Sequence, residues 1–321
     1  DSTPVREVFR ELALAPEMRN LPHPMLPTAD IILPGARIEF THVKDVLDAE
    51  ISRELPSGVV PLQTFLASIA EAEQALEPLL KENPILPPAR IREYFTYRRY
   101  AKTLQGLLRQ DGVDALAPLS SDPRLRAVFA APLSFLSGLA RPWRFPLASV
   151  RLVNHFSRGL FHVEWGLDAL KALLLDRIRS NSGDVRINDH VDMLVVRGGR
   201  VREVEIRSRD EEIGVGLLAA GTDLGSLLDL VPERQAKARY RARVAKMLPS
   251  HVIVTINIGA ARELVPEGMA QTAYMVKHPA APLEGANMRM VSVDPAMEPA
   301  DSMDPEHVTV AASALLPYDR Y

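Results

Sequence analysis

The spacing of the apolar residues changes near residue 182, and this change constrains the fold more than any other feature of the sequence. Across residues 62–136, apolar side chains recur at intervals of three and four, which is the period of an amphipathic helix. After residue 182, apolar and polar residues alternate, as they do in half-buried strands. The pattern therefore predicts a mixed α/β (α+β) protein in which three or four helices pack as one layer.

A double glycine, Gly198-Gly199, marks the turn of a β-hairpin in the second half of the chain. The usual two-residue hairpin turn needs a positive φ at both central residues, which glycine adopts at little cost. Residues 191–195 alternate before this turn, and a third strand over residues 213–220 would complete a meander. A short strand over residues 185–187 is expected to precede it.

The remaining elements are expected on both sides of this meander. Helices are predicted from Pro4, over residues 43–54 and over residues 233–247, and the layer of helices breaks at residues 84–88 and 111–112. A hairpin over residues 30–40 turns at Pro34-Gly35. Four later strands suggest a second, antiparallel sheet; they cover residues 251–258, 270–277, 288–293 and 308–316.

The composition excludes several kinds of chemistry. None of the 321 residues is cysteine, so disulfides, thiolate catalysis and thiolate metal sites are ruled out. The histidines show no metal-binding spacing, and we interpret His155, His162 and His190 as structural. The formal net charge of -3 gives no general attraction to nucleic acid.

The sequence also bears on where the protein acts. It has no apolar run of about 18 residues that would span a membrane, and residues 1–4 have no signal-peptide pattern. The absence of cysteine fits a reducing compartment. We therefore expect a cytoplasmic protein, and peripheral contact with a membrane stays open.

One short match to a phosphate-binding fingerprint occurs, where Gly214-Val-Gly-Leu-Leu-Ala219 fits G-x-G-x-x-A. A true fingerprint follows an apolar strand and opens a helix. This match follows the charged residues 207–212 and is itself predicted as strand. We therefore do not interpret it as a phosphate loop.

Residues 159–232 resemble the middle of the phytoene desaturase and flavin-containing amine oxidoreductase family. The resemblance is carried by a helix, by Gly183-Asp-Val-Arg-Ile, by the meander and by the apolar run Leu217-Leu-Ala-Ala-Gly-Thr-Asp. Residues 26–40 and 314–318 are similar to other phrases of the family. The chain departs from the pattern at Glu164-Trp165, where the family usually has two glycines.

The resemblance implies a two-domain flavin amine oxidase-like fold. Residues 160–232 would be the middle segment of the FAD-binding domain, and residues 1–159 and 233–321 a substrate-binding domain of helices on an antiparallel sheet. The implied activity is FAD-dependent dehydrogenation or desaturation of an apolar, isoprenoid or carotenoid-like substrate, with hydride transfer to the flavin. The family's opening Gly-rich fingerprint and closing flavin segment have no counterpart here. A longer chain, a partner subunit or a relic that kept the substrate half would each account for that.

The resemblance also implies four cofactor-binding residues and leaves the catalytic residues unknown. Val191 lies where the family's backbone meets the adenine, although a core-facing strand valine is an equal alternative. Ala219, Ala220 and Gly221 lie where the last strand passes the cofactor, although an ordinary strand-to-helix turn also needs small residues. No metal is expected.

Two basic stretches and a second function class remain open. Residues 90–102 and 234–246 are rich in arginine and lysine, and each is either a solvated helix face or a membrane-surface contact. The alternative to an enzyme is a flavin-free binding or assembly subunit of a split flavoprotein, or a carrier of an apolar ligand. A partner subunit or a homo-oligomer is compatible with either function.

Overall fold

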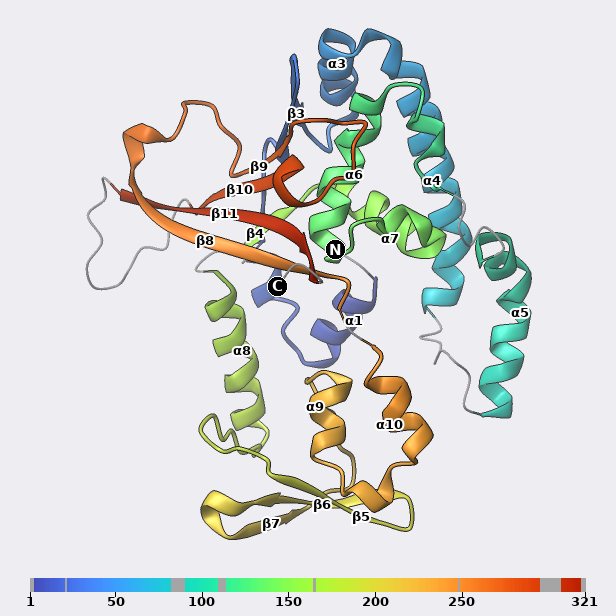
Figure 1. Cartoon of the computed structure of the whole chain (residues 1–321), viewed down its shortest axis with the longest axis vertical. Coiled ribbons are helices and arrows are strands. Elements are labelled where there is room, and N and C mark those ends of the chain that lie inside the picture. The colour runs from blue at the N-terminus through green and yellow to red at the C-terminus, as the bar shows by residue number, and fades with distance from the viewer. Residues whose placement is uncertain are drawn as a thin grey trace. The chain divides into compact units, whose positions relative to one another are not determined.

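The computed structural model describes residues 3–20, 22–81, 90–108, 114–163, 166–247, 249–294 and 307–318. It consists of two compact units (Figure 1). The larger unit comprises Asp1–Ala172 and Ser250–Tyr321, and the smaller unit comprises Leu173–Pro249. Both contain helices and sheet, so the predicted mixture of helix and strand is confirmed.

A six-stranded sheet organises the larger unit, with the strand order β3-β2-β9-β10-β11-β8. Its strands are β2 (Ala29–Leu33), β3 (Ala36–Phe40), β8 (His251–Ala261), β9 (Thr272–Val276), β10 (Met288–Asp294) and β11 (His307–Pro317). The predicted hairpin is confirmed, with Gly35 at a φ of 72° in its turn. The four later strands pair antiparallel in a sheet separate from the meander, as predicted. The hairpin was not expected to belong to this sheet, which it joins through the parallel pair β2–β9.

The helices of the larger unit are mostly those that the sequence predicts. They are α1 (Thr3–Glu11), α2 (Glu17–Asn20), α3 (Lys44–Glu54), α4 (Val59–Lys81), α5 (Ile91–Leu108), α6 (Pro123–Ser137) and α7 (Pro146–Ser157). Helix α6 begins where the Asp122 carboxylate accepts the Arg124 backbone N–H at 2.8 Å, and it ends at Gly138 in the left-handed conformation. The predicted breaks at residues 84–88 and 111–112 lie outside the described residues.

Helices α4, α6 and α7 pack on one face of the six-stranded sheet and form the core (Figure 1). An aromatic cluster joins these layers. Phe129 of α6 lies 5.6 Å from Phe40 of β3, 5.5 Å from Phe65 of α4 and 6.4 Å from Phe156 of α7, measured between ring centroids. All four rings are buried, so this cluster fixes the position of the sheet against the helices.

The smaller unit contains the predicted meander, made of β5 (Met193–Arg197), β6 (Arg200–Ile206) and β7 (Glu211–Gly214). Gly198 and Gly199 have φ values of 62° and 73°, so the predicted double-glycine turn is confirmed. The unit also holds the end of α8 (Gly166–Ser180), together with α9 (Leu224–Asp229) and α10 (Ala238–Val244).

Three predictions in this unit were wrong. Residues 185–187 form no strand, because Arg186 pairs with Asp184 and Glu211 through its side chain and the backbone there joins no ladder. The third strand ends at Gly214 rather than at residue 220. The predicted helix over residues 233–247 is a 3₁₀ turn and the short α10, since Ala236 and Lys237 between them are extended.

The compact units begin and end at other residues than the predicted domains. The smaller unit runs over Leu173–Pro249, whereas the segment that resembles the flavin domain was placed at residues 160–232. The assignment of those residues to a flavin-binding domain stays a prediction. The departure at residues 164–165 lies outside the described residues.

Candidate functional site

Val191 and the segment of residues 216–222 carry the predicted cofactor site. Val191 is half-buried and lies just before β5, outside any strand. The last backbone bond that holds the third strand runs from the Val215 N–H to the Arg202 carbonyl at 2.7 Å. Beyond it the chain has no regular structure, and Ala219, Ala220 and Gly221 are all exposed. The expectation that these small residues lie at the end of a strand was therefore wrong.

The segment of residues 216–222 is apolar except for Thr222, and all of its residues are exposed. Leu217 is 90% exposed, and a side chain placed on Gly221 would meet no atom within 4 Å. Asp223 ends the segment and caps α9, because its carboxylate accepts the backbone N–H groups of Gly225 at 2.8 Å and Ser226 at 3.0 Å. The hydrogen bond from the Ser226 hydroxyl and these N–H groups lower the pKa of Asp223.

The same segment cannot serve as a phosphate-binding loop on its own. Gly214 closes β7, and the next helix begins only at Leu224. A phosphate loop needs a strand that turns directly into a helix, so that the helix N-terminus points at the phosphate. The open backbone at Ala219–Gly221 would admit a flat group, and no hydrogen bond among the described residues joins it to Val191. Their joint role in binding FAD stays a prediction.

The sheet of the larger unit offers a second candidate, on the face opposite the helices. Directly paired residues of antiparallel strands have their side chains on the same face. Here the pairs form two rows, Val293–Val310–Ile258 and Val291–Ala312–Ile256, and Val254 with Ala314 extends them. Every one of these side chains is apolar. We call this surface, made of Val291, Val293, Val310, Ala312, Ala314, Val254, Ile256 and Ile258, the apolar sheet face.

The apolar sheet face is exposed where it reaches β8, the edge strand. Ile256 is 62% exposed, and Val254 and Ile258 are also exposed, while Thr255 and Asn257 point to the other face of the strand. A contiguous exposed apolar surface on a folded domain usually marks a binding site. The alternation over residues 252–258 is visible in the sequence, although our sequence analysis did not interpret it as a site.

The other end of this face is polar and is fixed by a buried carboxylate. Asp30 of β2 is only 1% exposed, and it accepts hydrogen bonds from Arg37 of β3 at 3.0 Å and from the Ala270 N–H at 2.9 Å. The hydrogen bond to Asp30 raises the pKa of Arg37. Arg37 also donates to the Gly268 carbonyl at 2.8 Å, so the loop before β9 is fastened to the hairpin.

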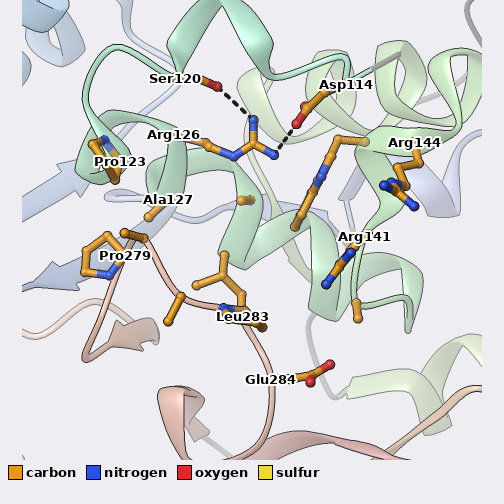
Figure 2. Close-up of a pocket in the computed structure, with 16 residues that line it drawn as sticks. Asp114, Ser120, Pro123, Arg126, Ala127, Arg141, Arg144, Pro279, Leu283 and Glu284 are labelled. Atoms are coloured by element: carbon orange, nitrogen blue, oxygen red, sulfur yellow. Dashed lines mark hydrogen bonds and ion pairs between the residues drawn. The ribbon is translucent and has the colours of Figure 1, made fainter. Parts of the chain in front are cut away.

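Among the described residues of the larger unit, side chains line two cavities that include no predicted cofactor residue. The first, of about 510 Å³, is mainly apolar; its lining is Val5, Arg6, Phe9, Ala15, Met18, Pro22 and Phe161. The second, of about 420 Å³, lies between α6, the 3₁₀ helix Pro142–Arg144 and the loop that joins β9 to β10. Figure 2 shows Arg126, Arg141 and Arg144 around it, and we call it the arginine cavity.

One histidine–carboxylate pair borders the second cavity, because Glu284 in its lining lies 3.0 Å from His251. Burial, followed by the charges of Arg151 and Arg158, lowers the pKa of His155, and burial raises the pKa of Tyr274. Neither residue lines a cavity. The described residues also hold no cluster of three or more potential metal ligands, and none of their helices has the length and apolar composition needed to cross a membrane.

The comparisons with known proteins give one distant relationship. No protein-family model matches the sequence. A 4,4'-diapophytoene desaturase (4,4'-diapolycopene-forming) from Methylomonas sp is 24% identical over 208 residues, which cover 57% of this chain and 40% of that relative. The chain thus spans well under two thirds of the relative's length. The match supports a relationship to phytoene desaturase-like proteins and nothing finer.

Among solved structures, the PF1083 protein from Pyrococcus furiosus is similar with a TM-score of 0.46 and 13% sequence identity. The similarity covers 98% of this chain and 64% of that one. At this level, the two proteins need not share a fold.

Proposed function

We propose that this chain is part of an FAD-dependent oxidoreductase of the desaturase type that acts on an elongated apolar substrate. The observation that carries the proposal is the apolar sheet face, which presents three exposed branched side chains on one edge strand. The distant match to a diapophytoene desaturase supports the reaction class. The chain's own residues would bind and orient the substrate and keep water away from it.

This face is long enough to contact a stretch of a hydrocarbon chain. Residues 254–258 of β8 rise about 3.4 Å each, so Val254, Ile256 and Ile258 extend over about 14 Å. Such a strip offers many weak contacts and no polar group to fix a particular position along the chain. We therefore expect recognition of an isoprenoid or carotenoid-like substrate by length and hydrophobicity.

The described residues fit part of the cofactor. The half-buried Val191 would lie at the adenine of FAD, and the exposed backbone of Ala219–Gly221 would lie beside the cofactor. The pyrophosphate needs a glycine-rich turn that these 321 residues lack. A bound flavin supplies a two-electron acceptor for the reaction. The missing turn would come from another segment, from a partner subunit or from a second copy.

Flavin binding and substrate binding can be tested separately. FAD titrated into the purified protein should show saturable fluorescence quenching, and Gly221→Trp should weaken it because the added ring fills the open space. For the sheet face, Ile256→Asp should weaken binding of an apolar fluorescent probe such as retinol by about tenfold or more, since one aliphatic side chain contributes 1.5–3 kcal/mol on burial.

Asn257→Asp is the matched control for the sheet-face variant. It adds the same charge to the same strand, on the opposite face, and should leave retinol binding unchanged. Equal loss in both variants would mean that the apolar sheet face is not the binding surface. Flavin fluorescence that never saturates would contradict cofactor binding by this chain.

The alternative is a flavin-free subunit or apolar-ligand carrier, favoured by the lack of a phosphate loop in the sequence. Such a protein would bind retinol as well as the enzyme would, yet it would not respond to FAD. The pair of titrations therefore separates the two functions. If the chain is an assembly subunit of a split flavoprotein, the exposed Leu217 would contact the partner subunit, and Leu217→Asp would abolish association of the two subunits.

We also propose a peripheral membrane contact through the smaller unit. Arg234, Lys237, Arg239 and Arg243 around α10 are exposed, and none forms an ion pair with another described residue. Arg241 differs, because it donates to the Val231 carbonyl at 2.6 Å. An apolar substrate dissolves in the lipid bilayer, and exposed basic side chains bind the anionic headgroups at the bilayer surface.

Co-sedimentation with anionic vesicles at low salt tests this contact. Arg239→Glu with Arg243→Glu should abolish sedimentation, whereas the charge-matched pair Arg200→Glu with Arg202→Glu on β6 should not. Unchanged sedimentation in the first double variant would remove the membrane proposal.

A further inference from the structure

The arginine cavity contains one arginine whose charge is already compensated. Arg126 of α6 forms an ion pair with Asp114 at 2.7 Å and donates to the Ser120 hydroxyl at 3.1 Å, as Figure 2 shows. Its guanidinium also lies 5.0 Å from the centre of the Trp143 ring. Arg126 is therefore a fixed part of the wall.

The other two arginines are not compensated. Arg141 and Arg144 are exposed, and neither guanidinium has a hydrogen bond or ion pair with any residue that the structure describes. Arg141 immediately precedes the 3₁₀ helix Pro142–Arg144, and Arg144 is its last residue. Arg141 itself has a non-helical backbone, with a φ of -140° and a ψ of 60°. Both arginine side chains line the cavity.

The walls that carry these groups are held in shape by hydrogen bonds. The Ser149 hydroxyl donates to the Pro142 carbonyl at 3.0 Å, and the Ala115 N–H donates to the Trp143 carbonyl at 3.0 Å. Across the cavity, the Asn287 amide accepts from the His278 N–H at 2.8 Å and donates to the Pro282 carbonyl at 2.8 Å. A preformed site loses little freedom when it binds a ligand.

The balance of charge in the cavity favours an anion with an apolar body. Three arginines line it against two carboxylates, Asp114 and Glu284, and Glu284 is held by His251 at 3.0 Å. Apart from Ser120 and Trp143, the rest of the lining is alanine, proline and leucine, and includes Ala127, Pro279 and Leu283. Guanidinium groups bind carboxylate and phosphate oxygens through paired hydrogen bonds.

We propose that the arginine cavity is a binding site for a small organic acid or phosphate ester, whose anionic oxygens are held by Arg141 and Arg144. Its volume of about 420 Å³ lies within the range of small-molecule sites. This site lies apart from the apolar sheet face and does not depend on a flavin. Its role would be to bind a small ligand or effector that the proposed desaturase chemistry does not require.

Calorimetric titration of the purified chain with inorganic phosphate and with benzoate tests the proposal. Both probes should bind saturably at one site, and Arg141→Ala or Arg144→Ala should each weaken binding by about tenfold, the effect of one charge-assisted hydrogen bond. The affinity of Arg144→Lys should lie between that of the unmodified chain and that of Arg144→Ala, because lysine keeps the charge and loses the paired hydrogen bonds. Higher salt should weaken binding.

Arg262→Ala supplies the matched control. Arg262 is exposed in the same unit, lies outside the cavity and forms no ion pair with a described residue, so its removal should change the affinity by less than twofold. The proposal is overturned if neither probe binds saturably to the unmodified chain. It is equally overturned if Arg262→Ala weakens binding as much as the cavity variants do.

Discussion

Replacement of Asp30 by asparagine should destabilise the larger unit far more than its small change in size implies. The Asp30 side chain is 1% exposed and accepts hydrogen bonds from Arg37 at 3.0 Å and from the buried Ala270 N–H at 2.9 Å. Both donors bond to Oδ2, while Oδ1 accepts from the Arg37 Nε–H at 3.4 Å. Asparagine keeps the volume, but it removes the charge that pairs with Arg37 and places an N–H₂ group against either the Nε–H or the two donors on Oδ2. One charge-assisted bond is lost, which costs about 1.5–3 kcal/mol of the free energy of unfolding.

Urea unfolding followed by tryptophan fluorescence measures the loss of unfolding free energy in the larger unit of the protein. Both tryptophans, at positions 143 and 165, belong to the larger unit. The control is Glu39→Gln, which removes a carboxylate that is 47% exposed and 3.6 Å from the same arginine. An exposed ion pair contributes about 0–1 kcal/mol, so this variant should unfold almost as the unmodified chain does.

A double-mutant cycle shows whether Arg37 is the relevant partner. Arg37→Ala alone should destabilise the unit, because Asp30 is then buried without its cation and the Gly268 carbonyl loses its donor at 2.8 Å. In the Asp30→Asn background, the same substitution should cost measurably less. The reasoning fails if Asp30→Asn loses no more stability than Glu39→Gln, or if the two losses at Asp30 and Arg37 simply add.

Two further predictions concern the backbone and pH. Gly199→Ala should destabilise the meander by about 1–2 kcal/mol because the φ of Gly199 is 73°, while Gly214→Ala, with open space and no positive φ, should be neutral; hydrogen exchange over β5 and β6 measures both. Burial, and then nearby arginines, lower the pKa of His155, so the unfolded state takes up the proton first as pH falls below about 6.5. Stability should therefore fall from pH 7.5 to 5.5 by less in His155→Gln than in the unmodified chain or in the exposed His278→Gln. Equal pH dependence in all three would exclude this explanation.

The sequence predicted those elements whose local chemistry is sufficient to define them. The turn at Gly198-Gly199 needs positive φ, and the apolar residues at intervals of three and four over residues 62–136 define helices α4 and α6. The hairpin of β2 and β3 was found for the same reason. Its place in the sheet was not, because the pairing of Ile31 with Tyr274 joins strands 243 residues apart, and no local pattern specifies such a partner.

For the candidate sites too, local features could be predicted from the sequence and contacts between distant residues could not. The third strand was predicted to continue to residue 220 because Leu217 and its neighbours are apolar, yet an apolar run becomes strand only where a partner strand is present. The arginine cavity could not be predicted, since Arg141 and Leu283 are brought together only by packing. The alternation on β8 was the one signal of the apolar sheet face that the sequence carried.

Exposed apolar side chains at Leu217 and Ile256 do not contribute to folding in the way that buried ones do. Burial of one such side chain stabilises a protein by about 1.5–3 kcal/mol, and Leu217, 90% exposed, gains almost none of this. The apolar character of these two residues is thus explained by contacts with a bound partner or ligand. In the proposed function, Leu217 contacts a partner subunit and Ile256 contacts the apolar substrate. It follows that Ile256→Asp should leave the free energy of unfolding, measured with urea, within about 0.5 kcal/mol of that of the unmodified chain while it weakens retinol binding. A variant that lost stability and binding together would show instead that Ile256 acts through the fold.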